Sequence, residues 1–386
     1  MARVSKPNPL RSNMFQSIMQ AAVVISMLAG GGCAVFSPEA GIGSATSWGR
    51  LAGWREDELI QAWEALAQQC DSASDKTAVV VWCEAADELQ TEPRREEIRA
   101  FFESRAKPYR LHGSYGRRDG LVTGYYEPLL MGSRHPDERF RYPLYQVPEE
   151  LLVVELGELF PELQGKRVRG RVENGKVLPF YPREHIDSEQ QPLAGQELFW
   201  VDDAVDAFFL QIQGSGIVQL PDGSRHGVAY AQQNGHPYRA IGRDLVDQGE
   251  IPLEDISLFS IRDWLDANPD KAQELMNRNP SYVFFKDAGP ATAEGPDGSL
   301  GVPLTAERSV AVDRSIVPLG SPLWLETTLP DGSHYRRLVF AQDTGGAIAG
   351  AVRADVFFGR GARAEQLAGT MKQTGRLYLI QLNDDL

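Results

Sequence analysis

The chain has 386 residues, three cysteines and a formal net charge of −14. Removing the first 32 residues, which hold three bases and no acids, leaves 36 bases against 53 acids and a net charge of −17. Such an excess of acid argues against charge-driven binding to nucleic acid or to an anionic membrane surface. A chain of this length exceeds what one hydrophobic core usually holds, so we expect two lobes.

The first 32 residues have the pattern of a signal peptide. Three basic residues precede an apolar run at 21–29, and three glycines then lead into Cys33. A basic start, a short apolar run and a small-residue exit are typical of export signals. The run is too short to span a bilayer, so we predict cleavage rather than a membrane helix.

The cysteines raise two separate questions. Small residues before Cys33 resemble a bacterial lipoprotein processing site, so we expect acylation of Cys33 and a Gly/Ser/Ala-rich tether over 33–50. Ordinary cleavage and release into the periplasm is the alternative. In an oxidising compartment Cys70 and Cys83 could pair, or they could remain two free buried thiols.

Apolar periodicity predicts helices first and strands afterwards. Residues 59–67 have helical spacing, and Thr91 with Pro93 predicts the start of a second helix. The pattern becomes β from about residue 110, with a strand over 121–128. A strand interrupted by glycines is predicted over 207–218.

The C-terminal half repeats this order. Helices are predicted at 240–248 and at about 255–278, where Asn268 is an N-cap and Pro269 the first helical residue. β structure is predicted from 299 to 359, followed by a helix near 363–373 and a closing strand at 377–382. Strands separated by helices and long loops favour barrel-like β lobes over a doubly wound sheet.

Three aspartates stand out as candidate catalytic residues. Asp343 and Asp355 bracket a glycine-rich turn, and Asp313 lies thirty residues upstream. If 353–359 is a strand, Asp355 shares a face with Phe357, and burial there would raise the pKa of Asp355 as a general acid requires. Alternatively, Asp355 is a surface acid paired with Arg353. Asp343 could equally cap its own turn, and Asp313 could fix a loop.

A second group of side chains has the character of a sugar-binding site. Hydroxyls, an amide and aromatic rings lie on glycine-broken segments, a combination that binds sugars and many other ligands. The candidates are Thr123, Tyr125, Tyr126, Gln213 and Ser215.

Other chemistries have little support in the sequence. Aspartic proteases need two Asp-(Ser/Thr)-Gly loops or one per subunit, and only one such loop occurs, at 343–345. The histidines and cysteines lack metal-ligand spacing, so we expect no metal and no cofactor. The glycines at 214 and 216 lack a phosphate-loop lysine, and there is no Gly-x-Ser-x-Gly elbow.

Several short motifs together resemble the membrane-bound lytic murein transglycosylase A family, which has a C-terminal three-aspartate domain. The resemblance covers nearly all of the chain beyond the signal peptide. The motifs are Val122-Thr-Gly-Tyr-Tyr126, Tyr142-Pro-Leu-Tyr145, Gln213-Gly-Ser-Gly216, Asn234-Gly-His-Pro-Tyr238, Asn279-Pro-Ser-Tyr-Val-Phe-Phe285 and the segment with the aspartates.

This resemblance implies a mainly β fold with helices, in which a smaller β domain is inserted into a double-psi β-barrel domain. The barrel domain would comprise 51–127 and 239–386, and the inserted domain 128–238. A glycan strand would lie in the groove between them.

The resemblance also implies an activity. Family members cleave the β-1,4 bond between N-acetylmuramic acid and N-acetylglucosamine without water and leave a 1,6-anhydro ring. The catalytic acid falls on Asp355 and a second essential acid on Asp343, with one residue more between them than the family pattern has. A peptidoglycan hydrolase or a non-catalytic peptidoglycan-binding lipoprotein are the alternatives.

The implied partners are peptidoglycan glycan strands and the outer membrane. We expect a monomer that is lipid-anchored on the periplasmic side of the outer membrane. A soluble periplasmic protein is the alternative.

Overall fold

The computed structural model describes residues 40–72, 77–89, 92–164 and 167–383. The predicted signal peptide, Cys33 and the tether before residue 40 lie outside this part. Within the described residues, no helix has both the length and the apolar character needed to cross a membrane.

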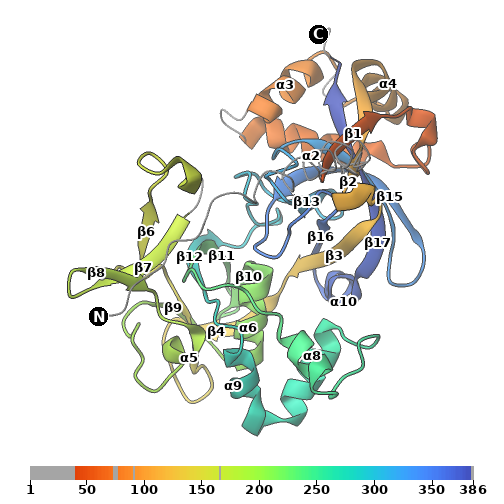
Figure 1. Cartoon of the computed structure of the whole chain (residues 1–386). Helices are drawn as coiled ribbons and strands as arrows, with labels where there is room; N and C mark the ends of the chain where they lie inside the picture. Colours follow the sequence, from red (N-terminus) through yellow and green to blue (C-terminus); the bar gives the residue numbers. More distant parts are fainter. Residues whose placement is uncertain (1–39, 73–76, 90–91, 165–166, 384–386) are drawn as a thin grey trace, which may run out of the picture. The chain divides into compact units, whose positions relative to one another are not determined.

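Eight strands form the largest sheet (Figure 1). They are β1 (Gly41–Ala45), β2 (Ala106–His112), β3 (Gly120–Glu127), β13 (Ser309–Val312), β14 (Pro322–Thr328), β15 (His334–Asp343), β16 (Ala354–Arg360) and β17 (Lys372–Leu382). The order β17-β14-β15-β13-β16-β3 closes on itself because β3 also pairs with β17. The result is a six-stranded barrel, which β2 and β1 extend beyond β17.

Every second side chain of the barrel strands points inward, and these side chains fill the barrel. Val310 and Val312 of β13 belong to its interior cluster, as do Ala354 and Val356 of β16. Since successive side chains of a strand point to opposite faces, Ala311 and the residues that pair with it point outward. The outer face is therefore the one that can carry a site.

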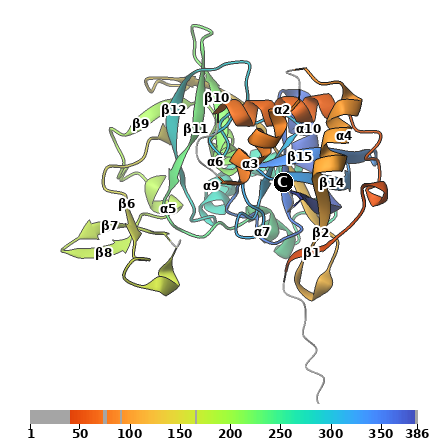
Figure 2. The ribbon, with the colours of Figure 1, turned by 90° about the horizontal axis from the view of Figure 1, so that it is seen from above.

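Helices pack on the barrel and account for the first helical predictions. The structure has α2 (Leu59–Ser72), α3 (Thr77–Ala86) and α4 (Arg95–Arg105) before β2, and α10 (Ala362–Thr370) before β17. Figure 2 shows α2 beside β15. Trp63 and Leu66 of α2 are buried in one cluster with Trp324 and Phe340, which are barrel residues. The predicted helices at 59–67 and after Pro93 are thus confirmed, whereas α3 was not predicted.

A buried ion pair fastens the start of α2 to the barrel. Arg308 is fully buried, and its two terminal nitrogens each donate to a carboxylate oxygen of Asp57 at 2.9 Å. Arg308 also donates to the carbonyl oxygens of Leu338 and Glu58. Because both side chains are buried, loss of either partner would leave the other charge buried and unpaired.

Two further sheets follow β3 in the chain. One has the strand order β12-β11-β10-β4-β9-β5 and the other the order β6-β7-β8. Their bounds are β4 (Leu129–Ser133), β5 (Tyr142–Tyr145), β6 (Leu152–Glu155), β7 (Arg167–Glu173), β8 (Lys176–Pro179), β9 (Glu197–Val201), β10 (Ser215–Gln219), β11 (Arg225–Gln233) and β12 (Val283–Pro290). Because β12 pairs with β11 and not with a barrel strand, we propose that the inserted domain runs from 128 to about 290 rather than ending at 238.

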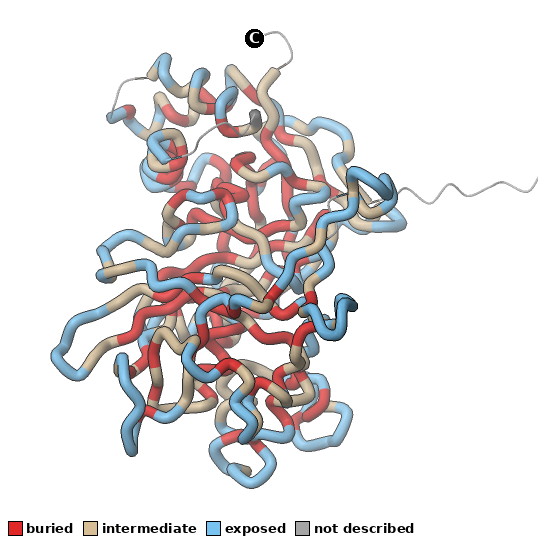
Figure 3. Tube along the Cα trace, turned by 90° about the vertical axis from the view of Figure 1, so that its left-hand side faces the viewer, coloured by how far each residue is buried: buried red, intermediate tan, exposed pale blue. Residues whose placement is uncertain are grey.

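The remaining helices belong to this part of the chain. They are α5 (Arg183–Ile186), α6 (Ala204–Gln213), α7 (Ile241–Asp247), α8 (Leu258–Ala267) and α9 (Pro269–Asn277), with 3₁₀ turns at Trp48–Arg50, Ser114–Gly116 and Pro161–Leu163. The predictions for 240–248 and 255–278 are confirmed, including Pro269 as the first residue of α9. In Figure 3 the buried residues, in red, gather in the middle of the trace, and the exposed residues, in pale blue, lie mostly at its periphery.

The prediction of a strand over 207–218 was wrong for its first half. Residues up to Gln213 form α6, and only Ser215–Gln219 form a strand. Asp203 caps the helix by accepting hydrogen bonds from the amides of Val205 and Asp206, at 2.7 and 2.8 Å, and Gly214 ends it at a φ of 85°. The apolar run misled because a helix buried on most sides has no polar stripe.

Candidate active site

The candidate site is a row of residues that pair directly across neighbouring strands on the outer face of the barrel. Ala311 on β13 pairs with Asp343 on β15 and with Asp355 on β16. Asp355 pairs in turn with Thr123 on β3, and Thr123 with Lys372 on β17. Residues that pair directly across strands lie on the same face, so the row brings together two of the three predicted aspartates and Thr123.

A β-bulge brings Asp343 onto this face. The register of β13 and β15 shifts between Val310 and Ala311, so that β15 has one residue more than its partner, at Gln342. Simple alternation from the interior residue Ala341 would send Asp343 into the barrel. Bulges re-aim side chains in this way and are frequent beside active sites.

The methyl group of Ala311 is the only side chain between the two acids on the row. Asp343 and Asp355 lie on strands separated by β13, so their backbones are about 9–10 Å apart, twice the usual strand spacing. Ala311 is itself buried, in one cluster with Tyr125 and Phe357. A small side chain at this position makes room for the Tyr125 ring, which reaches Asp343 from β3.

Asp355 has the environment of a carboxylic acid that can hold its proton. It is half-buried, and Oδ1 accepts a hydrogen bond of 2.5 Å from the hydroxyl of Thr123. Burial raises the pKa of Asp355 above its ordinary value; the bond from Thr123 and the charge of Arg353 oppose this increase, and the charge of Asp343 adds to it. Arg353 itself donates to the carbonyl oxygens of Ala354 and Leu121, and no ion pair joins it to Asp355 in the described part of the chain.

Tyr125 links β3 to Asp343. Its ring is buried against Phe357, the residue that pairs with it on β16, with ring centroids 5.3 Å apart. The phenol donates a hydrogen bond of 2.8 Å to Oδ2 of Asp343. Burial and the charge of Asp343 raise the pKa of Tyr125 well above its ordinary value, so the phenol remains a donor at physiological pH.

Ser299 belongs to the site although sequence reasoning missed it. Its amide and hydroxyl donate to Oδ1 of Asp343 at 2.9 and 2.8 Å, and the amide of Thr344 donates to the same oxygen at 2.8 Å. Four donors therefore hold the Asp343 carboxylate. Three of the four bonds reach Oδ1 and one reaches Oδ2, so the orientation of the carboxylate is fixed from two sides.

A sequence signal for Ser299 did exist. Residues 296–299 are a third copy of the Pro-Asp-Gly-Ser tetrapeptide that also occurs at 221–224 and 330–333. In those two turns the serine donates to the aspartate of its own turn. Ser299 instead bonds Asp343, so the third copy serves the site.

Asp313 lies next to the site and fixes a loop. Its Oδ1 accepts from the amide and hydroxyl of Ser315, and its Oδ2 accepts from the amide of Gly350 at 2.7 Å. Burial works against ionisation, but the bonds from Ser315 and Gly350 outweigh it and hold the pKa of Asp313 below its ordinary value. By binding Gly350, Asp313 orders the segment that leads from Asp343 to Asp355.

Three of the predicted binding residues contact other parts of the molecule. The hydroxyl of Tyr126 donates to Glu365 of α10 at 3.0 Å. The side-chain oxygen of Gln213 accepts from the amide of Tyr126 at 3.1 Å. Ser215 is buried in β10, where it pairs with Ala229. None of these contacts involves Asp343 or Asp355, and a role of these three side chains in binding a glycan stays a prediction.

No group of three or more His, Cys, Asp or Glu side chains within the described ranges is arranged to hold a metal ion. The row presents the carboxyl groups of Asp343 and Asp355, the hydroxyl of Thr123 and, at its end, Lys372. Asp355 can keep its proton, and Asp343 is held in place as a hydrogen-bond acceptor.

Comparison with known proteins supplies the biological class. Residues 121–286 match the MltA specific insert domain and residues 308–381 match the 3D domain. Membrane-bound lytic murein transglycosylase A of Vibrio cholerae is 34% identical over 68% of this chain and 66% of that protein.

Two solved structures show the same fold. The membrane-bound lytic murein transglycosylase of Agrobacterium tumefaciens is 32% identical, covers 89% of this chain and 98% of its own, and has a TM-score of 0.78. Escherichia coli MltA with bound chitohexaose is 25% identical, covers 90% and 95%, and has a TM-score of 0.66. The relatives define a class of enzymes that act on murein. The chain belongs to the membrane-bound lytic murein transglycosylase A family, with a 3D domain.

Proposed function

We propose that this protein is a lytic transglycosylase that cleaves the β-1,4 bond between N-acetylmuramic acid and N-acetylglucosamine in peptidoglycan. The reaction uses no water and leaves a 1,6-anhydromuramic end. Asp355 is its single general acid and base. The row that places Asp355 between Ala311 and Thr123, two strands from an Asp343 that four donors hold, is the observation that carries the proposal.

Asp355 acts first as the acid. A raised pKa keeps its carboxyl protonated closer to neutral pH, where it can donate to the glycosidic oxygen. As the bond to the leaving sugar breaks, positive charge develops on the muramic ring. The partly exposed Asp355 then holds the negative charge, which the hydroxyl of Thr123 stabilises.

The second half of the reaction needs a base and a nucleophile. The muramic C6 hydroxyl is already part of the substrate, so its attack on C1 is intramolecular and has a high effective concentration. The carboxylate of Asp355 takes the proton of this hydroxyl as the anhydro ring closes. The enzyme ends the cycle in its starting protonation state.

Asp343 stabilises the charged transition state rather than activating water. Four donors already bond its two oxygens. Glycosidases that hydrolyse their substrates use a second carboxylate as a base or nucleophile. A carboxylate bound in this way is better suited to balance the charge of an oxocarbenium-like ring.

The names of the relatives support the proposed substrate and localisation. Their names refer to murein, and one solved relative holds chitohexaose, a β-1,4 chain of N-acetylglucosamine. The relatives are also named as membrane-bound. We propose that acylated Cys33 anchors a monomer to the periplasmic side of the outer membrane.

A digest of purified peptidoglycan tests the activity. Mass spectrometry of the wild-type products should show anhydro muropeptides, each lighter by one water than the hydrolysis product. Asp355→Asn should abolish turnover while circular dichroism and co-sedimentation with peptidoglycan remain unchanged. Asp247→Asn, at an exposed helical aspartate whose side chain is 68% accessible, is the matched control and should behave like the wild type.

Reducing-end products would instead identify a hydrolase. Intact glycan that co-sediments with the protein would identify a binding module. Wild-type activity in Asp355→Asn would remove Asp355 from the mechanism.

A further inference from the structure

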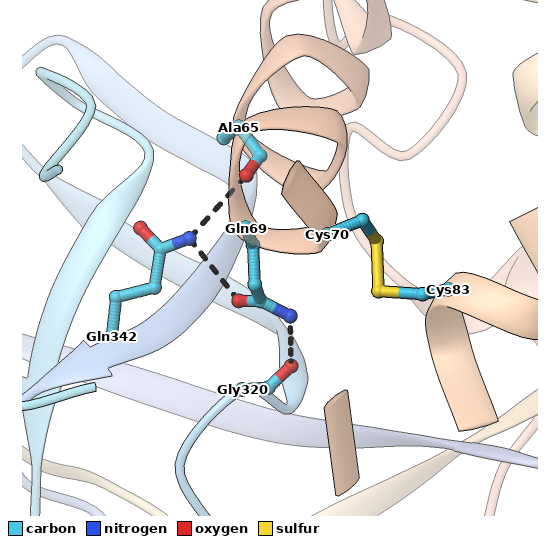
Figure 4. The surroundings of a disulfide bond; sticks show 6 residues. All are labelled: Ala65, Gln69, Cys70, Cys83, Gly320 and Gln342. Carbon is cyan, nitrogen blue, oxygen red and sulfur yellow. Dashed lines mark hydrogen bonds between the residues drawn. A yellow bond between two sulfur atoms is a disulfide. The ribbon is translucent and has the colours of Figure 1, made fainter. Parts of the chain in front are cut away.

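A chain of buried amides connects α2 to the bulge beside Asp343 (Figure 4). Gln342 and Gln69 are both fully buried. The amide nitrogen of Gln342 donates to the side-chain oxygen of Gln69 at 3.1 Å and to the carbonyl oxygen of Ala65 at 3.4 Å. Gln69 donates in turn to the carbonyl oxygen of Gly320 at 3.1 Å. The extra residue of β15 is thus held from outside the barrel by α2.

The helix α3 supports the loop that binds Asp343. Val79 of α3 packs in one buried cluster with Leu300 and Val302. The amide of Leu300 donates to the carbonyl oxygen of Gln342 at 3.0 Å. Ser299, which precedes Leu300, donates to Asp343 from both its amide and its hydroxyl.

A disulfide ties these two helices together. Cys70, next to Gln69 on α2, is bonded to Cys83 on α3. Cys83 also packs at the edge of the cluster around Val79. The helix that holds the strand bearing Asp343 is therefore cross-linked to the helix that supports its donor loop.

We propose that the Cys70–Cys83 disulfide, together with Gln69 and Gln342, positions Asp343 against Ser299 and so sets the geometry of the active site. These are positioning residues, because they act on the substrate only through Asp343. The inference rests on the proposed function for its effect on turnover. Its effect on the Asp343 environment does not depend on that function.

Reversible reduction tests the proposal on an unchanged sequence. Both cysteines are partly exposed, so a mild reductant can reach the bond. Reduction should lower kcat by roughly ten- to a hundredfold, since a misplacement of about 1 Å at a catalytic group costs up to ~10²-fold. Reoxidation should restore the rate. A Cys70→Ser/Cys83→Ser variant should show the low rate at once and should not respond to reductant.

The pH profile separates positioning from general stability. The charge of Asp343 contributes to the raised pKa of Asp355. If Asp343 moves away, the pKa of Asp355 falls, and the alkaline limb of kcat should shift to lower pH. KM should change less than kcat. A loss of folded protein alone would lower the measured rate by the same factor at every pH and would leave the alkaline limb in place.

Amide hydrogen exchange gives a readout that does not depend on activity. The amides of Ser299 and Thr344 bond Asp343, and both should exchange at least tenfold faster after reduction, while the interior strand β13 stays protected. A similar variant, Gln69→Leu/Gln342→Leu, should reproduce this change with the disulfide intact.

The outcomes are distinct. If the wild type forms no anhydro product, the proposed function fails, and the exchange experiment still decides the positioning role. If the disulfide-free protein keeps wild-type exchange at Ser299 and Thr344, the inference is overturned. Wild-type kcat and pH profile per folded molecule would overturn it as well.

Discussion

Replacing Thr123 with valine tests the chemistry of Asp355 without removing the acid. The substitution keeps the shape of the side chain and deletes the hydroxyl that bonds Oδ1 of Asp355 at 2.5 Å. This distance is typical of a hydrogen bond from a hydroxyl to a charged carboxylate. Thr123 should therefore stabilise the ionised form of Asp355 more than the protonated one.

The size of the effect follows from that difference. A hydrogen bond to a charged group is worth about 1.5–3 kcal/mol, against about 0.5–1.5 kcal/mol for a neutral pair. As Asp355 gives up its proton, the transition state gains the difference of about 1–2 kcal/mol, which corresponds to a ~5- to 30-fold rate effect. We expect Thr123→Val to lower kcat by this factor.

The hydrogen bond from Thr123 also determines in which direction the pH profile of the variant should shift. The bond from Thr123 lowers the pKa of Asp355, so its loss should raise that pKa further. Activity requires protonated Asp355 and falls as the pH rises through this pKa. The alkaline limb of kcat/KM should therefore move to higher pH in Thr123→Val, although the maximum rate is lower.

Steady-state release of anhydro muropeptides, measured across a pH series, is the assay. Thr123→Ser retains a hydroxyl and is the matched control. A Thr123→Val enzyme with the wild-type kcat and an unmoved alkaline limb would refute this reasoning.

Two further predictions concern the frame of the site. Asp57→Asn should lower the free energy of unfolding, measured in urea, by about 3–5 kcal/mol, because the buried Arg308 would lose its charged partner. A change below about 1 kcal/mol would contradict the assigned role of the pair. Gly124→Ala should lower the free energy of unfolding by about 1–3 kcal/mol and reduce activity, because the added Cβ would lie 2.4 Å from the ring of Phe358. A variant with the melting temperature and turnover of the wild type would show that β3 tolerates the methyl group.

The local elements that were predicted correctly have strong sequence signals. Pro269 after Asn268 marks the start of α9, and the periodic apolar residues after Leu59 mark α2. The wrong prediction at 207–218 arose where α6 is buried on most of its surface, so its residues show no polar stripe. Periodicity fails for such segments because both helices and strands can be apolar throughout.

The site was predictable in its residue types but not in its geometry. The sequence identified Asp355 and Asp343 as candidates, yet nothing in their spacing shows that β13 lies between their strands. The bulge at Gln342, which depends on contacts with α2, is also a tertiary effect. Tyr126 shows the limit of a motif, because its neighbour Tyr125 faces the acids and Tyr126 does not.

The disulfide also could not be predicted from the sequence alone. Two cysteines separated by 13 residues left pairing and free thiols equally open. Their partnership depends on how α2 and α3 pack, which spacing alone does not determine.

A digest in water enriched in ¹⁸O tests the central claim most directly. If Asp355 serves as the only acid and base and the muramic C6 hydroxyl is the nucleophile, the wild-type products contain no ¹⁸O at the new ends and are lighter by one water than reducing-end products. Incorporation of one ¹⁸O per cleaved bond would show that water attacks the sugar, and the single-acid transglycosylase mechanism would then be wrong.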